Sequence, residues 1–196
     1  IKYRKIILIA YPLQQNLIKQ YLQLGYAFNG NTYIGNVADS LKYYKSKILT
    51  LPTGIKIRTS LDIDIRNILK LAKLSHNAEE TSRGRDVTSK QKKVYNKMIK
   101  KSVKDNATFL LEKNKILIGY IWLALLSKDE NIVGGIAVHP NYWRKGFANI
   151  LYNEAFQFMK SKGIKSYMGT SSTKAVMNLA DKLNRKIVMS SYYVYV

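Results

Sequence analysis

The spacing of hydrophobic residues divides most of the chain into strands and helices. Apolar and polar positions alternate in residues 55–59, which predicts a half-buried strand. Apolar side chains recur at helical spacing in residues 62–75, after Ser60 or Asp62, either of which can cap a helix. Residues 76–87 lose this spacing and are predicted to form a loop. The same analysis predicts strands at 108–113, 116–126, 132–138, 164–169 and 186–196, and helices at 88–104, 147–162 and 171–183.

The order of these elements indicates the fold class. From residue 55 onward it is β-α-α-β-β-β-α-β-α-β, which predicts an α+β or mixed α/β fold and not a strict β-α repeat. Pro52 and Gly54 interrupt the pattern, so we expect an N-terminal extension over 1–53 and a main domain over 54–196. The extension has its own elements, with strands at 6–10 and around 33–34 and helices at 14–24 and 37–48.

Composition excludes several classes of protein. The 196 residues include no cysteine and two histidines, so disulfides, thiolate zinc sites and a cysteine nucleophile are excluded. We therefore expect no metal site. Apolar runs are too short for a membrane span, and we expect a cytoplasmic protein.

The net charge is the strongest signal in the composition. Lysine and arginine outnumber aspartate and glutamate by 33 to 12, which gives +21. Such a field attracts polyanions, namely nucleic acid, an anionic membrane face or a phosphorylated cofactor. An alternative is that AT-rich coding DNA alone accounts for the many lysines. The charge by itself does not choose between these explanations.

The segment from Val138 to Ala148 carries the clearest chemistry. A predicted strand runs into a polar, basic loop, and Gly146 opens a helix. Free backbone N–H groups and the helix dipole favour an anion at such a place, and a glycine lets a phosphate approach closely. Arg144 and Lys145 add positive charge at the rim. The alternative is an ordinary helix start whose basic side chains are solvated.

This segment and the order of elements resemble the GCN5-related N-acetyltransferase superfamily over about residues 54–196. The family's loop pattern contains a valine, a proline, an arginine or glutamine, a basic residue, a glycine and a small residue. The segment departs from the pattern at Trp143, where the family has arginine or glutamine, and at Arg144, where glycine is common. The residues that match it are Val138, Pro140, Lys145, Gly146 and Ala148.

The resemblance implies acetyl-CoA as co-substrate and a mostly antiparallel central sheet flanked by helices. Its pyrophosphate would bind the loop, and its pantetheine arm would pair with the preceding strand like an added strand. Gly134-Gly135 in that strand fits a bulge or the close approach of another group, and the alternative is a weak edge. Thr173 either contacts the cofactor or caps a helix. The implied cofactor-binding residues are Ile136, Ala137, Val138, Arg144, Lys145, Gly146, Phe147, Ala148 and Thr173.

The catalytic residues are less clear. Many members of the family have a tyrosine on the fourth helix that acts as the general acid, and this chain has Ala180 at that position. Tyr192 or Tyr193 is a candidate acid from the last strand, and the alternative for each is a packed sheet aromatic. Glu130 shares the strand parity of Ile132, so it is a candidate base, with a solvated turn carboxylate as the alternative. Glu79 and Glu80 lie in the predicted loop that often lines the acceptor site in this family, and the same alternative applies.

The N-terminal extension contains a short match to the same family. The run from Tyr21 to Gly25 and Tyr26 resembles the family's Y-x-x-x-G-F helix ending. The extension is therefore either the remnant of a preceding acetyltransferase-like half, or an unrelated cap or an arm through which two copies form a homodimer. The start at Ile1 also indicates that the chain was cut from something longer or processed.

Two functions follow from these patterns. The first is an N-acetyltransferase that transfers acetyl directly from acetyl-CoA, in a ternary complex, to a primary amine of a protein, peptide, aminoacyl-RNA or small molecule. The basic stripe at 83–104 favours an RNA-associated or acidic-protein acceptor and argues against polycationic aminoglycosides. The second is a catalytically weak or inactive module that binds acyl-CoA, or nucleic acid through its basic face.

Overall fold

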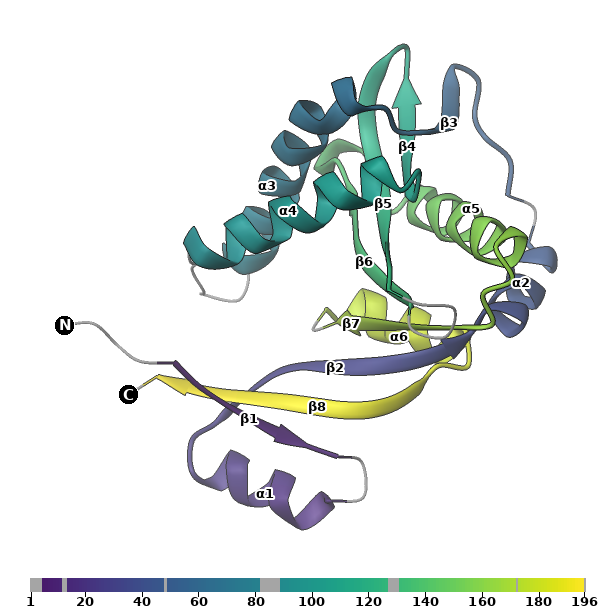
Figure 1. Ribbon diagram of the computed structural model, residues 1–196. Helices are drawn as coiled ribbons and strands as arrows, with labels where there is room; N and C mark the ends of the chain where they lie inside the picture. The colour runs from purple at the N-terminus through teal and green to yellow at the C-terminus, as the bar shows by residue number, and fades with distance from the viewer. Residues whose placement is uncertain are drawn as a thin grey trace.

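Strands from both ends of the chain and from its middle belong to a single sheet (Figure 1). The computed structural model describes residues 5–11, 14–47, 49–81, 89–126, 131–171 and 173–195. In these residues the strand order is β1-β8-β2-β7-β6-β5-β4-β3. Neighbouring strands are antiparallel except β6 and β7, which are parallel. The strands are Lys5–Ala10 (β1), Ala27–Asn36 (β2), Ile55–Thr59 (β3), Thr108–Lys113 (β4), Ile116–Leu125 (β5), Asn131–Val138 (β6), Ser166–Ser171 (β7) and Lys186–Tyr195 (β8).

Helices and strands follow one another in the predicted order, which confirms a mixed α/β fold with a mostly antiparallel sheet. Within the described ranges, none of the helices combines the length and hydrophobicity that crossing a membrane requires. The helices are Gln15–Gln23 (α1), Val37–Lys45 (α2), Ile65–Thr81 (α3), Ser89–Lys104 (α4), Phe147–Ser161 (α5) and Lys174–Lys182 (α6), with short 3-10 turns at Asp62–Asp64 (η1) and Pro140–Tyr142 (η2).

The predicted loop over 76–87 was wrong in its first half. α3 continues to Thr81, and residues 82–87 of that prediction lie outside the described residues. The apolar spacing of the sequence ends near residue 75, while the helical backbone continues to Thr81. Ala78 and Glu79 have good helix propensity, which supports such a turn without any apolar stripe.

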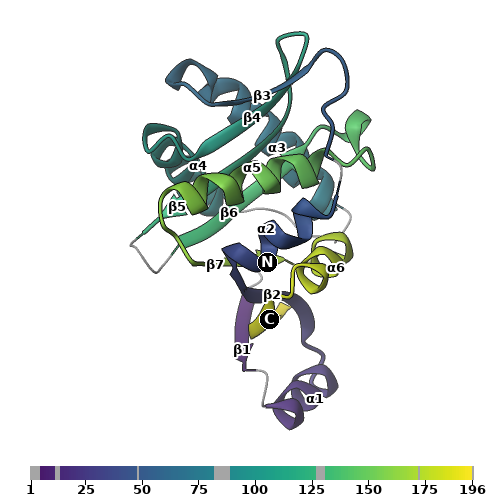
Figure 2. The ribbon, with the colours of Figure 1, turned by 90° about the vertical axis from the view of Figure 1, so that its right-hand side faces the viewer.

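Helices lie on both faces of the sheet (Figures 1 and 2), and a hydrophobic core lies beneath them on each face. α3 and α4 pack on one face of β5 and β6, while α5 covers the other and α2 packs against α5 and β2. Along β5, Ile121 and Leu123 face the α5 side, and Tyr120 and Trp122 face α3 and α4. Because both faces are buried, β5 is a nearly continuous apolar run and not an alternating one.

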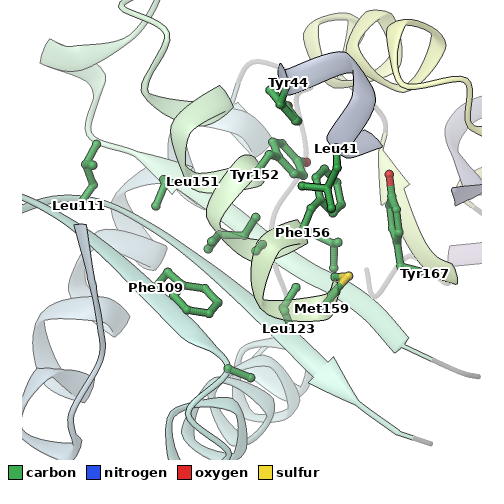
Figure 3. Packing of buried hydrophobic residues seen from close by; sticks show 14 of the residues in the cluster. Leu41, Tyr44, Phe109, Leu111, Leu123, Leu151, Tyr152, Phe156, Met159 and Tyr167 are labelled. Atoms are coloured by element: carbon green, nitrogen blue, oxygen red, sulfur yellow. The ribbon is translucent and has the colours of Figure 1, made fainter. Parts of the chain in front are cut away.

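The α5 side holds the larger core (Figure 3). Leu151, Phe156 and Met159 of α5 are fully buried against the sheet. Leu41 and Tyr44 of α2 pack into the same cluster, so the N-terminal segment contributes to the main core. The ring of Phe156 lies 4.8 Å from that of Tyr167 on β7, centroid to centroid.

The two ends of the chain form matching strand-helix-strand units. β1-α1-β2 and β7-α6-β8 have paired lengths of 6 residues for the first strands, 9 for the helices and 10 for the last strands. Each helix ends on a leucine cap, followed by a residue with positive φ, Gly25 at 83° and Asn184 at 52°. Figure 2 shows α1 and α6 on the same side of this part of the sheet.

The pairing of these units obeys an internal two-fold symmetry. Lys5 pairs with Tyr195 as Ser166 pairs with Asn36, and β2 pairs with β8 around the central pair Asn31 and Ser190. One bulge in each strand, at Asn29 and Val188, lies two residues before the central residue of its own strand. In a two-fold arrangement each contact is repeated with its partners exchanged, and these strands meet that condition.

The symmetry axis passes between the N-terminal and C-terminal parts of the chain. Ser190 Oγ donates to Asn31 Oδ1 at 2.7 Å on this axis. In the sheet, β2 lies between β7 and β8 and pairs with both strands. The predicted boundary at residue 53 falls in the connection between α2 and β3, while the strands on its two sides share one sheet.

Candidate functional site

The loop between β6 and α5 brings a row of backbone N–H groups to the surface. It leaves β6 at Val138 and enters the 15-residue helix α5 through Gly146. Arg144 and Gly146 both have positive φ, 60° and 80°, so the backbone turns sharply before α5 begins. The N–H groups of residues 144–148 donate to no acceptor among the described residues. Because the helix dipole points its positive end here, this loop can bind an anion.

Contacts to the sheet hold the loop in shape. The indole Nε1 of Trp143 donates to the carbonyl oxygen of Val138 at 2.6 Å. The backbone N–H of His139 donates to Ile118 O at 2.8 Å, and its Nδ1 accepts from the Asn141 N–H at 3.3 Å. Phe147 is buried in the α5 core and anchors the helix start. The N–H groups are therefore presented by a fixed backbone.

Positive side chains surround the exposed N–H groups. Arg144 and Lys145 are exposed on the loop itself. The Nζ of Lys145 lies 5.3 Å from the ring centroid of Tyr142, and the Nζ of Lys113 lies 5.8 Å from it. These charges favour a phosphate on the loop, because cations and free N–H groups act on the same anion.

The edge of β6 beside this loop is largely unpaired. β6 pairs with β7 only at Ile132 and Met168, so residues 133–138 have no partner strand on that side. Figure 1 shows the cause, since β6 and β7 run in clearly different directions. The open edge includes Ile136, Ala137 and Val138 and leads to the loop. An extended ligand can add to such an edge as a strand does.

A bulge interrupts β6 at the two adjacent glycines. Gly135 pairs with Trp122 and Val133 pairs with Leu123, so Gly134 has no partner across the β5–β6 ladder. Of the two interpretations of these glycines, the bulge is confirmed. It lies within the open stretch of β6, where its backbone groups turn away from regular pairing.

Both candidate tyrosines of the last strand lie away from this opening. β7 and β2 separate β8 from β6 in the sheet. Tyr192 is 5% exposed and packs against the rings of Tyr21 and Phe28, and burial raises its pKa. Tyr193 lies between Ile7 and Ala27 of the neighbouring strands. The structure therefore does not bring these phenols to the open edge of β6.

The remaining predicted residues fall in different places. Thr173 caps α6, where its Oγ1 accepts from the Val176 N–H at 3.4 Å. Ala180, at the position where relatives have tyrosine, is fully buried in α6. Glu130 lies outside the described residues, and the positions 79 and 80 belong to α3 without a described side chain. Among the described residues, no group of three or more His, Cys, Asp or Glu side chains could hold a metal ion.

Two aromatic residues that the sequence analysis did not single out lie at the bulge. Trp122 of β5 donates from Nε1 to the hydroxyl oxygen of Tyr95 on α4 at 3.2 Å. The adjacent glycines are the only local signal for these contacts. They show that something approaches the backbone closely, but they do not name the residues that do so.

Comparison with known proteins identifies a family. The profile of the Acetyltransferase (GNAT) family matches residues 68–184, which is more than half of the chain. No curated protein sequence matches the chain significantly.

Several solved structures share the fold. A GCN5-related N-acetyltransferase from Sphaerobacter thermophilus has a TM-score of 0.70 and 13% identity, over 98% of this chain and 60% of its own. A tandem GNAT protein from the clavulanic acid biosynthesis pathway has a TM-score of 0.63 and 8% identity, over 97% of this chain and 63% of its own. A GCN5-related N-acetyltransferase from Ralstonia eutropha has a TM-score of 0.53 and 16% identity, over 66% of this chain and 91% of its own. The chain thus spans less than two thirds of the first two proteins.

Proposed function

Since the chain belongs to the acetyltransferase (GNAT) family, we propose that it transfers the acetyl group of acetyl-CoA to a primary amine. The observation that carries this proposal is the continuity of the two binding features of the site. The open edge of β6 leads directly into the loop with exposed N–H groups, residues 144–148. An arm that pairs like a strand and ends in a pyrophosphate matches this arrangement.

The loop fits a pyrophosphate in both charge and shape. Successive N–H groups at a helix start can donate to phosphate oxygens, and Arg144 and Lys145 supply positive charge. Gly146 leaves the approach open, since a Cβ built there would have nothing within 4 Å. Residues 136–138 then lie along the pantetheine arm: alternate backbone groups, such as those of Ile136, face the open edge, while the Val138 carbonyl oxygen already accepts from Trp143 Nε1. Thr173 is already engaged as a helix cap, so we assign it a structural role.

The chemistry that this site needs is direct transfer within one complex. The neutral amine attacks the thioester carbonyl carbon, the C–N bond forms, the C–S bond breaks, and the thiol leaves after taking up a proton. Orientation of the two substrates supplies much of the rate, and a backbone N–H of the bulge can polarise the carbonyl. We keep Glu130 as the candidate base for the amine proton. No covalent enzyme intermediate is required.

The charge around the site favours an acceptor with negative charge. Lys93, Lys97 and Lys100 are exposed on α4. A groove of about 580 Å³ lies between α3 and the start of β5, lined by Lys70 and other lysines, and it reaches His139 at the loop. These features support an acidic protein or an RNA-associated amine as the acceptor. Acceptor turnover should therefore fall as salt rises, because salt screens exposed charges.

The internal symmetry supports a proposal for the N-terminal segment. Residues 5–36 repeat the strand-helix-strand unit that closes the acetyltransferase fold at residues 166–195. We infer that they are the closing unit of a second acetyltransferase-like half. The family's tyrosine position, filled by Ala180 in α6, corresponds to Tyr21 in α1, which fits this origin. The tandem architecture of one similar protein is in line with it.

The experiment for the proposed function is a thermal-unfolding titration of the full chain with acetyl-CoA and CoA. A ligand that binds only the folded state raises the midpoint by mass action. Gly146→Glu places a carboxylate among the free N–H groups of the loop at residues 144–148, where the pyrophosphate is proposed to bind. Gly163→Glu is its matched control, because Gly163 has φ 71°, an equally open Cβ position and lies at the other end of α5.

We expect both ligands to raise the midpoint of the wild type and of Gly163→Glu, and to leave Gly146→Glu unchanged. The control separates loss of binding from the cost of a side chain at positive φ. No shift in the wild type, or an equal shift in Gly146→Glu, contradicts the proposal. Nucleic-acid binding by the basic face is then the function to test.

A further inference from the structure

The main chain of β6 is in close contact with two aromatic side chains at its bulge. A Cβ on Gly134 would overlap the indole ring of Trp122. A Cβ on Gly135 would overlap the hydroxyl of Tyr95 and lie 2.8 Å from Trp122 Nε1. The two glycines therefore leave room for one aromatic pair that lies directly on the backbone.

Hydrogen bonds and ring contacts fix this pair in place. The rings of Tyr95 and Trp122 meet edge to face, 5.6 Å between centroids and 78° between planes. Trp122 Nε1 can only donate, and it does so to the Tyr95 oxygen at 3.2 Å. The hydroxyl of Tyr120 lies 3.4 Å from the same oxygen. Trp122 and Tyr120 are each 1% exposed, so the pair rests on packed core.

Tyr95 stands between this core and the outside. Its side chain is only partly buried on α4, and α4 contacts β5 beside the bulge (Figure 1). Of the two aromatic residues, Tyr95 is therefore the one that can be replaced without opening the core. Its hydroxyl lies over the main chain of Gly135, so Tyr95 reaches the strand along which the proposed ligand would bind.

The position of the bulge along β6 matches the reach of the proposed donor. The arm between the pyrophosphate and the sulfur of coenzyme A is about as long as four residues of a strand, roughly 13 Å. Val138 is the end of β6 next to the loop, so an arm that enters the edge beside Val138 reaches Gly134, four residues back and in the bulge. The acyl group of a donor bound as proposed would thus lie against Tyr95 and Trp122. This step rests on the proposed function.

We propose that Tyr95 and Trp122 form the end wall of the acyl pocket and restrict the donor to acetyl-CoA. A longer acyl chain has to displace Tyr95, which breaks its hydrogen bonds and its ring contact with Trp122. Packed interiors do not yield to added methylenes without strain. An acetyl group ends before this wall and leaves it undisturbed.

The test measures the binding of CoA, acetyl-CoA and hexanoyl-CoA to the full chain by titration calorimetry. We expect the wild type to bind acetyl-CoA at least about tenfold more tightly than hexanoyl-CoA, the scale on which a pocket rejects extra methylenes. Tyr95→Ala should bring the two affinities to within about twofold of each other. Tyr95→Phe is the matched control, because it keeps the ring and should keep the discrimination. Affinity for CoA without an acyl group should be the same in all three proteins.

Each outcome bears on one of the two proposals. Equal binding of acetyl-CoA and hexanoyl-CoA by the wild type overturns the proposal that Tyr95 and Trp122 limit the acyl pocket. This measurement requires no variant to fold. Discrimination that persists in Tyr95→Ala, with CoA affinity intact, places the barrier elsewhere and also overturns it. Failure of the wild type to bind CoA and acetyl-CoA at all overturns the proposed function itself.

Discussion

The hydroxyl of Tyr167 is the centre of a buried hydrogen-bonded chain that joins the N-terminal segment to the acetyltransferase core. Arg185 Nε donates to this hydroxyl at 2.9 Å, and Ser40 Oγ lies 2.7 Å from it. Ser40 gives its only proton to the carbonyl oxygen of Asn36 at 2.9 Å. Tyr167 must therefore donate to Ser40, and the chain runs from Arg185 through Tyr167 and Ser40 to the start of α2. Burial raises the pKa of Tyr167, which keeps this proton in place.

Tyr167→Phe removes the acceptor of a buried cation, and the structure sets the cost. Arg185 is 8% exposed, and its Nη2 already has no partner among the described residues. A hydrogen bond to a charged group contributes about 1.5–3 kcal/mol, and the orphaned donor adds a desolvation cost, so we expect a loss of about 3 kcal/mol. For a chain of this size that is a fall in the unfolding midpoint of roughly 6–12 °C.

Tyr152→Phe is the matched control for this prediction. Both rings are buried, and the guanidinium of Arg185 lies over both, 5.3 Å from the centroid of Tyr152 and 5.0 Å from that of Tyr167. A phenylalanine keeps either ring contact, and only the Tyr167 hydroxyl accepts from Arg185. Thermal and urea unfolding should give a loss within about 1 kcal/mol for Tyr152→Phe. Equal losses in the two variants refute the hydrogen-bond argument and leave ring packing as the cause.

Three further predictions concern the sheet, the acid stability and the bulge. Residues 54–196 alone should fail to unfold cooperatively in circular dichroism, because β7 and β8 lose the strand between them; a cooperative transition would contradict this. Arg58 holds the pKa of Asp64 below its usual value. The ion pair between them therefore stabilises the folded protein above about pH 4, and this stabilisation is lost as pH falls through the lowered pKa. Asp64→Asn should therefore narrow the difference in unfolding midpoint between pH 6 and pH 3, and an unchanged difference argues against the pair. Gly134→Ala should cost about 1–3 kcal/mol in urea unfolding, since its methyl overlaps the buried Trp122 ring; wild-type stability would show that the strand shifts freely.

Much of the fold could be read from local patterns. Alternation predicted β3, and helical spacing predicted α5, because one face of each is buried and the other is not. The prediction was wrong after residue 75, where α3 continues to Thr81 although the apolar spacing of the sequence has ended. Hydrophobic periodicity indicates which face of a helix is buried, so it gives no signal for a helical segment whose sequence has no apolar stripe.

The candidate site was predictable where it is contiguous. The loop at residues 138–148 has a glycine at the helix start and nearby cations, which neighbouring residues of the sequence show, and the structure adds the positive φ of Arg144 and Gly146. The catalytic residues were not predictable in this way. The sequence made Tyr192 a candidate acid on the last strand, but the order of the strands places it beyond β7 and β2.

By itself, then, the sequence determined the charge and predicted most of the elements, the family resemblance and a loop suited to an anion, since each rests on residues close together in the chain or on a local pattern. The tertiary structure decided which distant segments meet. It inserted β2 between β7 and β8 around the Asn31–Ser190 axis, and it brought Tyr95 of α4 and Trp122 of β5 onto the glycines of β6. Strand order and contacts between helices and strands depend on how faces pack across the whole sheet. No spacing rule along the chain encodes that packing.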